Sequence, residues 1–299
     1  MTLSPICLFV YKRYDLTVKT VTSLKENLYA NESDLFVFSD APKNDKDKYL
    51  VSEVRKYIKS IDGFKSVKII ERENNLGLAE SIISGVTEVI DQYGKVIVLE
   101  DDLLTSKYFL KYMNEALDKY ENENNVISIH GYVYPVKNKL PETFFLKGTD
   151  CWGWATWKRA WDTFEKNGKK LLDEIIEKKL AYGFDHNGTT NNIKMLKRQI
   201  KGEVDSWAIR WHASAFLQNR LTLYPGKSLI NNIGMGGEST HLKKTNIYET
   251  DIYNKPIELK DIPIEENIYA KKEIEKFFTS IKPNFIKRYY KKFKYSLGM

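Results

Sequence analysis

The chain has 299 residues, which is enough for one large α/β domain or two small ones. Hydrophobic residues make up 42% and charged residues 29% of it, a globular composition that excludes a disordered protein. The net charge is +7, from 47 basic and 40 acidic residues, and much of the excess lies in residues 282–295. The rest of the chain is close to neutral, which argues against a general nucleic-acid-binding protein.

Cysteine usage and apolar runs indicate the compartment. Cys7 and Cys151 do not have the spacing of metal ligands, and free thiols are expected in a reducing compartment. Residues 1–11 hold only a short apolar run with no basic region before it, unlike a signal peptide. No stretch approaches the ~18 apolar residues that span a bilayer. We therefore expect a cytoplasmic protein.

The first third of the chain alternates expected strands with expected helices. The run from Ile6 to Tyr11 is continuously apolar, as in a strand that is buried on both faces of a parallel sheet. Such alternation predicts an open, mostly parallel sheet with helices on both faces, and ligands bind such sheets at the carboxyl ends of the strands. We expect strands at 6–11, 35–38, 67–70 and 96–99, and helices at 15–29, 51–61 and 78–90.

The pattern becomes less regular further along the chain. A helix at 106–120 and a short strand at 126–129 are expected, and from about residue 131 loops and a tryptophan cluster follow. A regular front half and an irregular, aromatic-rich back half are typical of an enzyme that binds a common ligand first and a variable partner second.

Three consecutive acids, Glu100, Asp101 and Asp102, end the expected strand at 96–99. Burial and mutual repulsion would raise their pKa values, and a divalent cation at the strand end would remove both problems. Hard oxygen ligands favour Mg²⁺ or Mn²⁺. Neighbours on an extended chain point opposite ways, so only some of the three can bind the ion. Alternatively, Asp102 simply starts the next helix, where acids are favoured.

The order of four motifs, at 9–13, 39–40, 72–79 and 98–102, resembles that of the GT-A glycosyltransferase fold. It is most similar to bacterial family 2-type transferases and to the N-acetylglucosaminyltransferase I-like group, whose acidic motif is also Glu-Asp-Asp. The similarity covers about residues 5–245. It implies a Rossmann-like α/β domain with a nucleotide-sugar-binding half, an irregular acceptor-binding and catalytic half, and a basic aromatic tail. The corresponding residues are 1–103, 104–276 and 277–299.

The resemblance implies a set of nucleotide contacts. Asp40 would meet the base, and Arg72, Asn75 and Gly77 would lie beside the nucleotide. The residue types suit these roles, because Arg forms bidentate bonds with phosphate and Gly lets the backbone approach a ligand. Residues 75–77 could also be an ordinary turn before a helix.

The same resemblance implies a UDP-sugar donor held with Mn²⁺ or Mg²⁺. Asp102 would be the metal ligand, and Asp101 would face the ribose or the donor sugar. His241, at the end of the glycine-rich stretch 232–241, would complete the metal site or contact the diphosphate. The loop would act as a lid over the donor. A lone His is more often structural.

Tryptophans are dense between residues 150 and 157. The Gly-Trp-Ala-Thr-Trp stretch resembles a segment of surface-polysaccharide transferases that lines the sugar pocket. Exposed indole faces stack on sugars, so we expect Trp152, Trp154 and Trp207 to contact the donor or acceptor sugar. Trp161, four residues after Trp157, is interpreted as part of a helix's core stripe.

An inverting transferase needs a carboxylate that deprotonates the acceptor hydroxyl, a contribution of about 10²–10⁴-fold in rate. The resemblance places this base at an Asp that precedes a Trp, which is Asp205, with Glu203 as the second choice. Either residue could instead cap the following helix.

The tail, residues 277–295, alternates aromatic and basic side chains, a pattern typical of membrane-surface binding. A helix packed on the body would explain it equally well. Together these features predict a hexosyltransferase-type enzyme of cell-surface polysaccharide synthesis, acting on a glycan or lipid-linked acceptor, with peripheral contact to the inner face of the membrane.

Two other functions are considered. A sugar-phosphate nucleotidyltransferase would carry a glycine-rich loop after its first strand, and residues 11–15 contain no glycine. A non-enzymatic basic module that binds glycan or nucleic acid would not need the acidic triplet. Both alternatives are therefore less well supported by the sequence.

Overall fold

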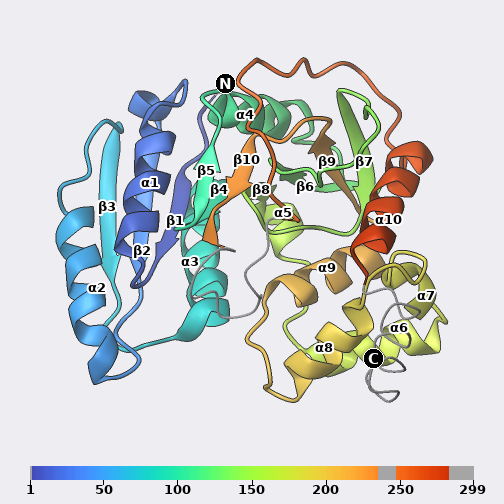
Figure 1. The fold of residues 1–299 in the computed structure, drawn as a ribbon, viewed down its shortest axis with the longest axis horizontal. Helices are drawn as coiled ribbons and strands as arrows, with labels where there is room; N and C mark the ends of the chain where they lie inside the picture. Colours follow the sequence, from blue (N-terminus) through green and yellow to red (C-terminus); the bar gives the residue numbers. More distant parts are fainter. Residues whose placement is uncertain (1, 235–246, 283–299) are drawn as a thin grey trace, which may run out of the picture.

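The computed structural model describes residues 2–234 and 247–282. The front half follows the expected alternation (Figure 1). Its elements are β1 (Ile6–Val10), α1 (Tyr14–Lys25), the 3₁₀ turn η1 (Ala30–Glu32), β2 (Asp34–Ser39), α2 (Asp45–Ile58), β3 (Ser66–Glu71), α3 (Gly77–Tyr93) and β4 (Lys95–Glu100). Every strand and helix expected here is present, with ends that differ by a few residues.

The back half alternates less regularly. Its strands are β5 (Leu103–Thr105), β6 (Val126–His130), β7 (Thr143–Lys147), β8 (Trp154–Trp157), β9 (Leu221–Pro225) and β10 (Ile230–Asn232). Its helices are α4 (Phe109–Lys119), α5 (Lys158–Trp161), α6 (Gly168–Glu177), α7 (Ala181–Phe184), α8 (Asn192–Ile200), α9 (Ala208–Leu217) and α10 (Ile268–Ile281).

One eight-stranded sheet, in the order β3-β2-β1-β4-β8-β6-β9-β7, runs through both halves. Strands β3, β2, β1 and β4 are parallel, whereas β8 pairs antiparallel with β4 and with β6. Strand β9 is parallel to β6, and β7 is antiparallel to β9. The sheet is thus mostly parallel, and the expected GT-A-type α/β architecture is confirmed.

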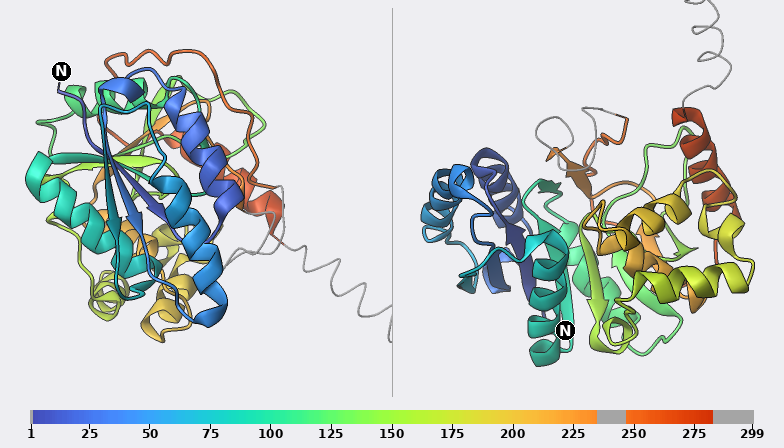
Figure 2. Two further views of the ribbon diagram at one scale, coloured as in Figure 1. Left: turned by 90° about the vertical axis from the view of Figure 1, so that its left-hand side faces the viewer. Right: turned by 90° about the horizontal axis from the view of Figure 1, so that it is seen from below.

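Helices cover both faces of this sheet (Figure 2, left). Because alternate strand residues point to opposite faces, the strands feed two separate apolar clusters. One joins strand residues such as Leu8 to α1, α2 and α4, and the other joins residues such as Phe9 to α3 and the tryptophans. This three-layer packing buries β1 completely. In such a sheet, ligands bind at the carboxyl ends of the strands.

The bounds of two helices, α2 and α10, differ from those expected from the sequence. Helix α2 begins at Asp45, six residues before the expected start, because the Asn44 side chain accepts a hydrogen bond from the Lys46 N–H and caps it. The expected tail boundary at residue 276 lies inside α10, whose Phe278 is buried. The tail residues from 283 onward are outside the described part. No helix within the described residues is both long and apolar enough to cross a bilayer.

Candidate active site

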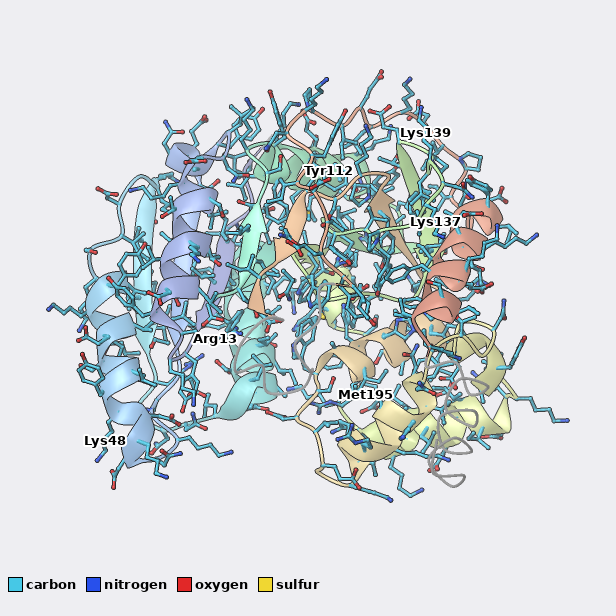
Figure 3. All side chains as sticks on the ribbon, in the orientation of Figure 1. Arg13, Lys48, Tyr112, Lys137, Lys139 and Met195 are labelled. Atoms are coloured by element: carbon cyan, nitrogen blue, oxygen red, sulfur yellow. The ribbon has the colours of Figure 1, made fainter. Side chains whose placement is uncertain are left out.

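The acidic motif lies at the carboxyl end of β4, next to the carboxyl end of β1. Phe9 pairs with Glu100 in the parallel ladder, so the residues that follow the two strands meet at one edge of the sheet. Arg13, labelled in Figure 3, stands at the N-terminal end of α1. Its guanidinium donates to Asp101 Oδ1 and lies 2.8 Å from Asp102 Oδ2. Arg13 therefore clamps both aspartates.

The charges of this cluster do not balance. Burial, followed by the charges of Asp102 and Asp101, raises the pKa of Glu100 to about 8. Burial likewise raises the pKa of Asp101 to about 6, although Arg13 opposes the shift. Burial would lower the pKa of Arg13, but the two aspartates outweigh it and hold that pKa above its usual value. Three acids facing one guanidinium favour the binding of a further cation.

The residues present fit a divalent ion that is shared with a ligand. The Asp101 Oδ2 atom is buried and has no hydrogen-bond partner among the described residues. Residues 2–234 and 247–282 contain no group of three or more His, Cys, Asp or Glu side chains arranged to hold a metal. Mg²⁺ usually takes only one or two carboxylates and completes its shell with water and substrate phosphates, so the small donor set is compatible with it.

The beginning of the glycine-rich stretch contacts the acidic motif. Strand β10 pairs antiparallel with β5, which follows the motif directly. The Ile233 N–H donates to the Asp102 carbonyl at 2.9 Å. A Cβ added to Gly234 would overlap Asp102 Oδ2 and approach the Arg13 guanidinium, so the backbone here lies directly against the carboxylate. His241 itself lies outside the described residues, and its role stays a prediction.

Asp40 organises the loop that leads into α3. Its carboxylate accepts hydrogen bonds from the backbone N–H groups of Ala41, Leu76 and Gly77 and from Asn75 Nδ2, at 2.9–3.1 Å. A carboxylate has about four lone-pair positions, so these donors occupy it fully. Asn75 also donates to the Ala41 carbonyl at 2.7 Å. The expected contact of Asp40 with a nucleotide base is untested and stays a prediction.

Arg72 lies at the end of β3 with unused donors. Its guanidinium lies 5.2 Å from the centre of the Phe38 ring and 3.6 Å from Glu88 Oε2. The Nε and Nη2 atoms are buried and have no hydrogen-bond partner among the described residues. A guanidinium that is 22% exposed, and whose ion pair with Glu88 is longer than a hydrogen bond, is suited to an anionic ligand.

Asp205 contacts the same loop from the other half of the chain. Its Oδ2 atom accepts a hydrogen bond from the Ala79 N–H at 3.1 Å. Gly77 has φ +75°, and a Cβ there would lie 3.0 Å from Asp205 Oδ2, so glycine suits both the backbone and the close approach. Glu203 is exposed and pairs with Arg198 on α8 instead. The structure thus brings Asp205, and not Glu203, to the loop beside Asp40.

The tryptophans divide into one partly exposed residue and a buried group. Trp152 is half-buried, with its ring edge-on to Tyr132 and Tyr248. Trp154 and Trp207 are only 1% and 2% exposed and stack on each other with ring centroids 5.1 Å apart. Their faces are covered by protein, so the expectation that these two stack on a sugar is corrected: they form part of the core.

The model of the protein family described as Glycosyl transferase family 2 matches residues 6–187. The chain belongs to glycosyl transferase family 2. The expected resemblance to family 2-type transferases is thereby confirmed, and the acidic motif, the Asp40 loop and the tryptophan segment all lie within the matched residues.

Several solved structures are similar to this family 2 glycosyltransferase. Mannosyltransferase PcManGT from Pyrobaculum calidifontis, in complex with GDP-Man and Mn²⁺, is 15% identical with a TM-score of 0.34, over 44% of this chain and 36% of that one. Residues 1–349 of S. aureus TarS are 12% identical with a TM-score of 0.42, over 77% and 60%. A further S. aureus TarS structure is 15% identical with a TM-score of 0.33, over 48% and 24%. The matches thus span between 24% and 60% of these relatives. No match was found among the curated proteins.

Two side-chain contacts were not foreseen in the sequence. Arg13 ends the 9–13 motif that carries the resemblance, but no role was assigned to it. A basic residue directly after the first strand of a parallel sheet was a usable signal. Asp150 accepts a hydrogen bond from the Tyr134 hydroxyl at 2.5 Å. No sequence pattern singled out this aspartate, since it lies in an irregular loop.

Proposed function

We propose that this family 2 glycosyltransferase moves a hexosyl unit from a UDP-sugar to a glycan or lipid-linked glycan acceptor, with inversion, in cell-surface polysaccharide synthesis. The observation that carries the proposal is the clamp of Arg13 on Asp101 and Asp102 at the carboxyl end of β4. A buried, net acidic cluster at the ligand-binding edge of a parallel sheet is suited to a cation and, through it, a diphosphate.

Mn²⁺ or Mg²⁺ at this edge would be held by Asp102, with His241 as the further ligand that the resemblance implies. The ion would supply Lewis-acid stabilisation of the diphosphate leaving group. Asp101 is assigned to the donor, because its Oδ2 atom is buried without a hydrogen bond in the described residues and can accept one from a ribose or sugar hydroxyl.

The nucleotide would lie between the ends of β2 and β3. The unused Nε and Nη2 groups of Arg72 can donate to its phosphate or base oxygens. Asn75 and Gly77 would form the wall of this site, on the loop that the Asp40 carboxylate keeps in place. Asp40 would contact the base from this loop while its carboxylate holds the backbone of residues 76 and 77.

Asp205 is assigned as the general base. It would take the proton of the acceptor hydroxyl while that oxygen attacks the anomeric carbon of the donor. The bond from the anomeric carbon to the diphosphate breaks with its electron pair on the leaving UDP, and attack from the opposite side inverts the configuration. Asp205 is exposed, so an acceptor can reach it, and its bond to Ala79 fixes its position beside the nucleotide loop.

Lipid-linked acceptors would be met at the inner face of the membrane. We assign this contact to the basic, aromatic residues 283–295, which follow α10 directly. Phe278 is buried in the body, so α10 would anchor the segment. Each Lys or Arg near an anionic lipid surface contributes about 1 kcal/mol to membrane binding.

A calorimetric panel of nucleotide-sugars tests the donor class, with product analysis by NMR for the anomeric configuration. We expect binding and turnover of a UDP-sugar in Mn²⁺ or Mg²⁺ and a product of inverted configuration. Turnover of a GDP-sugar alone would mean that the donor nucleotide is GDP and not UDP. A product of retained configuration would contradict the role of Asp205 as the general base. No turnover of any nucleotide-sugar would overturn the proposal.

A further inference from the structure

The β4–β8 pairing brings a further carboxylate, that of Asp150, to the edge of the sheet that holds the acidic motif. The antiparallel register pairs Lys95 with Trp157 and Val98 with Trp154. The pairing ends there, and because the two strands are antiparallel, the residues before Trp154 and the residues after Val98 lie at the same edge of the sheet. The electrostatics agree, because after burial the charges of Asp150, Glu100 and Asp102 all raise the pKa of the Cys151 thiol. Asp150 therefore lies on the same edge of the sheet as the proposed diphosphate site.

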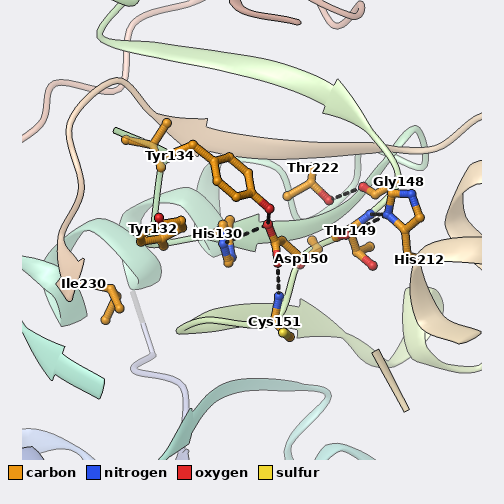
Figure 4. Close-up of polar contacts among 12 residues, drawn as sticks. His130, Tyr132, Tyr134, Gly148, Thr149, Asp150, Cys151, His212, Thr222 and Ile230 are labelled. Carbon is orange, nitrogen blue, oxygen red and sulfur yellow. Dashed lines mark hydrogen bonds and ion pairs between the residues drawn. The ribbon is translucent and has the colours of Figure 1, made fainter. Parts of the chain in front are cut away.

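Asp150 is held by neighbours that leave part of its carboxylate available (Figure 4). The Tyr134 hydroxyl donates to Oδ2 at 2.5 Å, and the Cys151 N–H donates to Oδ1 at 2.9 Å. Each oxygen then keeps one lone pair. The side chain is 20% exposed, so a ligand can reach a carboxylate whose direction is already fixed.

His130, fully buried beside Asp150, has no hydrogen bond within the described residues at either ring nitrogen. Its Nε2 lies 3.8 Å from Asp150 Oδ2, too far for a hydrogen bond, and its ring packs edge-on against Tyr132 and Tyr224. A buried donor without a partner is costly. His130 therefore packs beside Asp150 without a hydrogen bond to it.

An aromatic face lies two residues further along the chain. Trp152 is half-buried and is supported by the rings of Tyr132 and Tyr248, at centroid distances of 4.8 and 5.9 Å. A carboxylate accepts hydrogen bonds from sugar hydroxyls, while an indole packs against the C–H face of a pyranose. Asp150 and Trp152 together offer both kinds of contact.

We propose that Asp150 binds hydroxyl groups of the donor's glycosyl unit and so selects the sugar, with Tyr134 as the residue that positions it. The inference rests on the proposed function. The donor sugar, and not the acceptor, is assigned because the antiparallel pairing of β4 and β8 puts Asp150 at the same edge of the sheet as Asp102, where the diphosphate that carries the donor sugar is proposed to bind.

Asp150→Asn tests the inference, since the amide keeps the shape and still accepts from the Cys151 N–H. Calorimetry with UDP and with a panel of UDP-sugars, and initial rates with the same panel, are compared with wild type. We expect unchanged affinity for UDP, about 10–100-fold weaker binding of the preferred UDP-sugar, and a smaller preference for it over its epimers. Asp173→Asn, an exposed aspartate on α6, is the control and should match wild type.

The outcomes separate the inference from the function on which it rests. If wild type turns over a UDP-sugar and Asp150→Asn has the same donor KM and the same preference among epimers, the inference alone is overturned. If wild type turns over none, the proposed function fails, and the difference in affinity between UDP-sugar and UDP still decides the role of Asp150. A wild type that binds neither overturns both.

Tyr134→Phe tests the positioning role, because it removes only the hydroxyl. We expect a several-fold rise in donor KM with little change in kcat, and a smaller effect than that of Asp150→Asn. A lower melting temperature without any change in donor KM would mean that the hydroxyl serves stability alone and would overturn this part.

Discussion

The Asp205 carboxylate accepts a hydrogen bond from the Ala79 N–H at 3.1 Å, across 126 positions of sequence. Ala79 lies in the first turn of α3, directly after the loop that Asp40 organises. The proposed base and the proposed nucleotide loop are therefore one hydrogen-bonded unit. Substitutions at Asp205 can affect helix capping and catalysis separately, which makes the two roles distinguishable.

Asp205→Asn should keep the cap and lose the base. An amide oxygen still accepts from the Ala79 N–H, so we expect a melting temperature close to that of wild type. Transfer should fall by about 10²–10⁴-fold, because the amide cannot take the acceptor's proton. Asp205→Ala should lose the cap as well, at a cost of about 1 kcal/mol in the free energy of unfolding. Thermal melts and initial rates measure both effects.

Glu203→Gln is the matched control, because Glu203 pairs with Arg198 on the surface. It should transfer at the wild-type rate. An inactive Glu203→Gln together with an active Asp205→Asn would move the base to Glu203.

Arg13→Met should destabilise the acidic cluster. Loss of charge-assisted bonds to Asp101 and Asp102 is expected to cost about 1.5–3 kcal/mol in the free energy of unfolding. With the guanidinium gone, the raised pKa values of Glu100 and Asp101 should rise further. Groups with raised folded-state carboxyl pKa values bind more protons when folded, so the variant should regain stability as the pH falls from 8 toward 5.

Chemical denaturation across this pH range measures the effect of Arg13. Arg198→Met, which removes an exposed guanidinium, should show neither the loss of stability nor its recovery at lower pH. A pH-independent loss in Arg13→Met would contradict the clamp.

The parallel core of the fold was predictable because its signals are local. The strands β1, β2 and β4 each hold a continuous apolar run, and the amphipathic stripe of α3 is visible in the sequence alone. The Arg13–Asp101 contact joins residues 88 positions apart, and the β5–β10 pair joins segments more than 100 positions apart. Such contacts depend on how the elements assemble, and no spacing rule in one sequence specifies them.

The tryptophans illustrate a second limit of the sequence. Trp152 and Trp154 are equivalent by composition and spacing, but β8 begins at Trp154 and carries it into the sheet's core face. Trp152 stays in the preceding loop. Their different burial therefore follows from where the strand starts, which the pattern of residues did not reveal.

Trp154→Ala should consequently affect mainly stability, and Trp152→Ala mainly donor binding. The first removes a fully buried ring and is expected to cost about 3–5 kcal/mol in the free energy of unfolding. The second should cost less and should raise the donor KM several-fold, because a sugar contact is lost. Denaturation curves and donor KM values separate the two. A wild-type donor KM in Trp152→Ala would contradict the predicted contact between Trp152 and the sugar.

His130 should make the protein less stable in acid. Burial lowers its folded-state pKa to about 4, whereas an unfolded His titrates near 6.5. The unfolded chain therefore binds more protons between these values, and the free energy of unfolding falls as the pH drops from about 6.5 to 4. His130→Phe should show a shallower decline in the same window. Equal slopes for the two proteins would contradict a neutral, buried His130.

UDP binding measured by calorimetry, with Mn²⁺ and with a chelator, tests the central claim most directly when wild type and Asp102→Asn are compared. We predict that wild type binds UDP more tightly in Mn²⁺ and that Asp102→Asn loses this gain while still unfolding in one cooperative thermal transition. Wild-type affinity that is the same with and without the metal, or a metal-dependent gain that survives in Asp102→Asn, would contradict the assignment of the acidic motif to a metal-bound diphosphate.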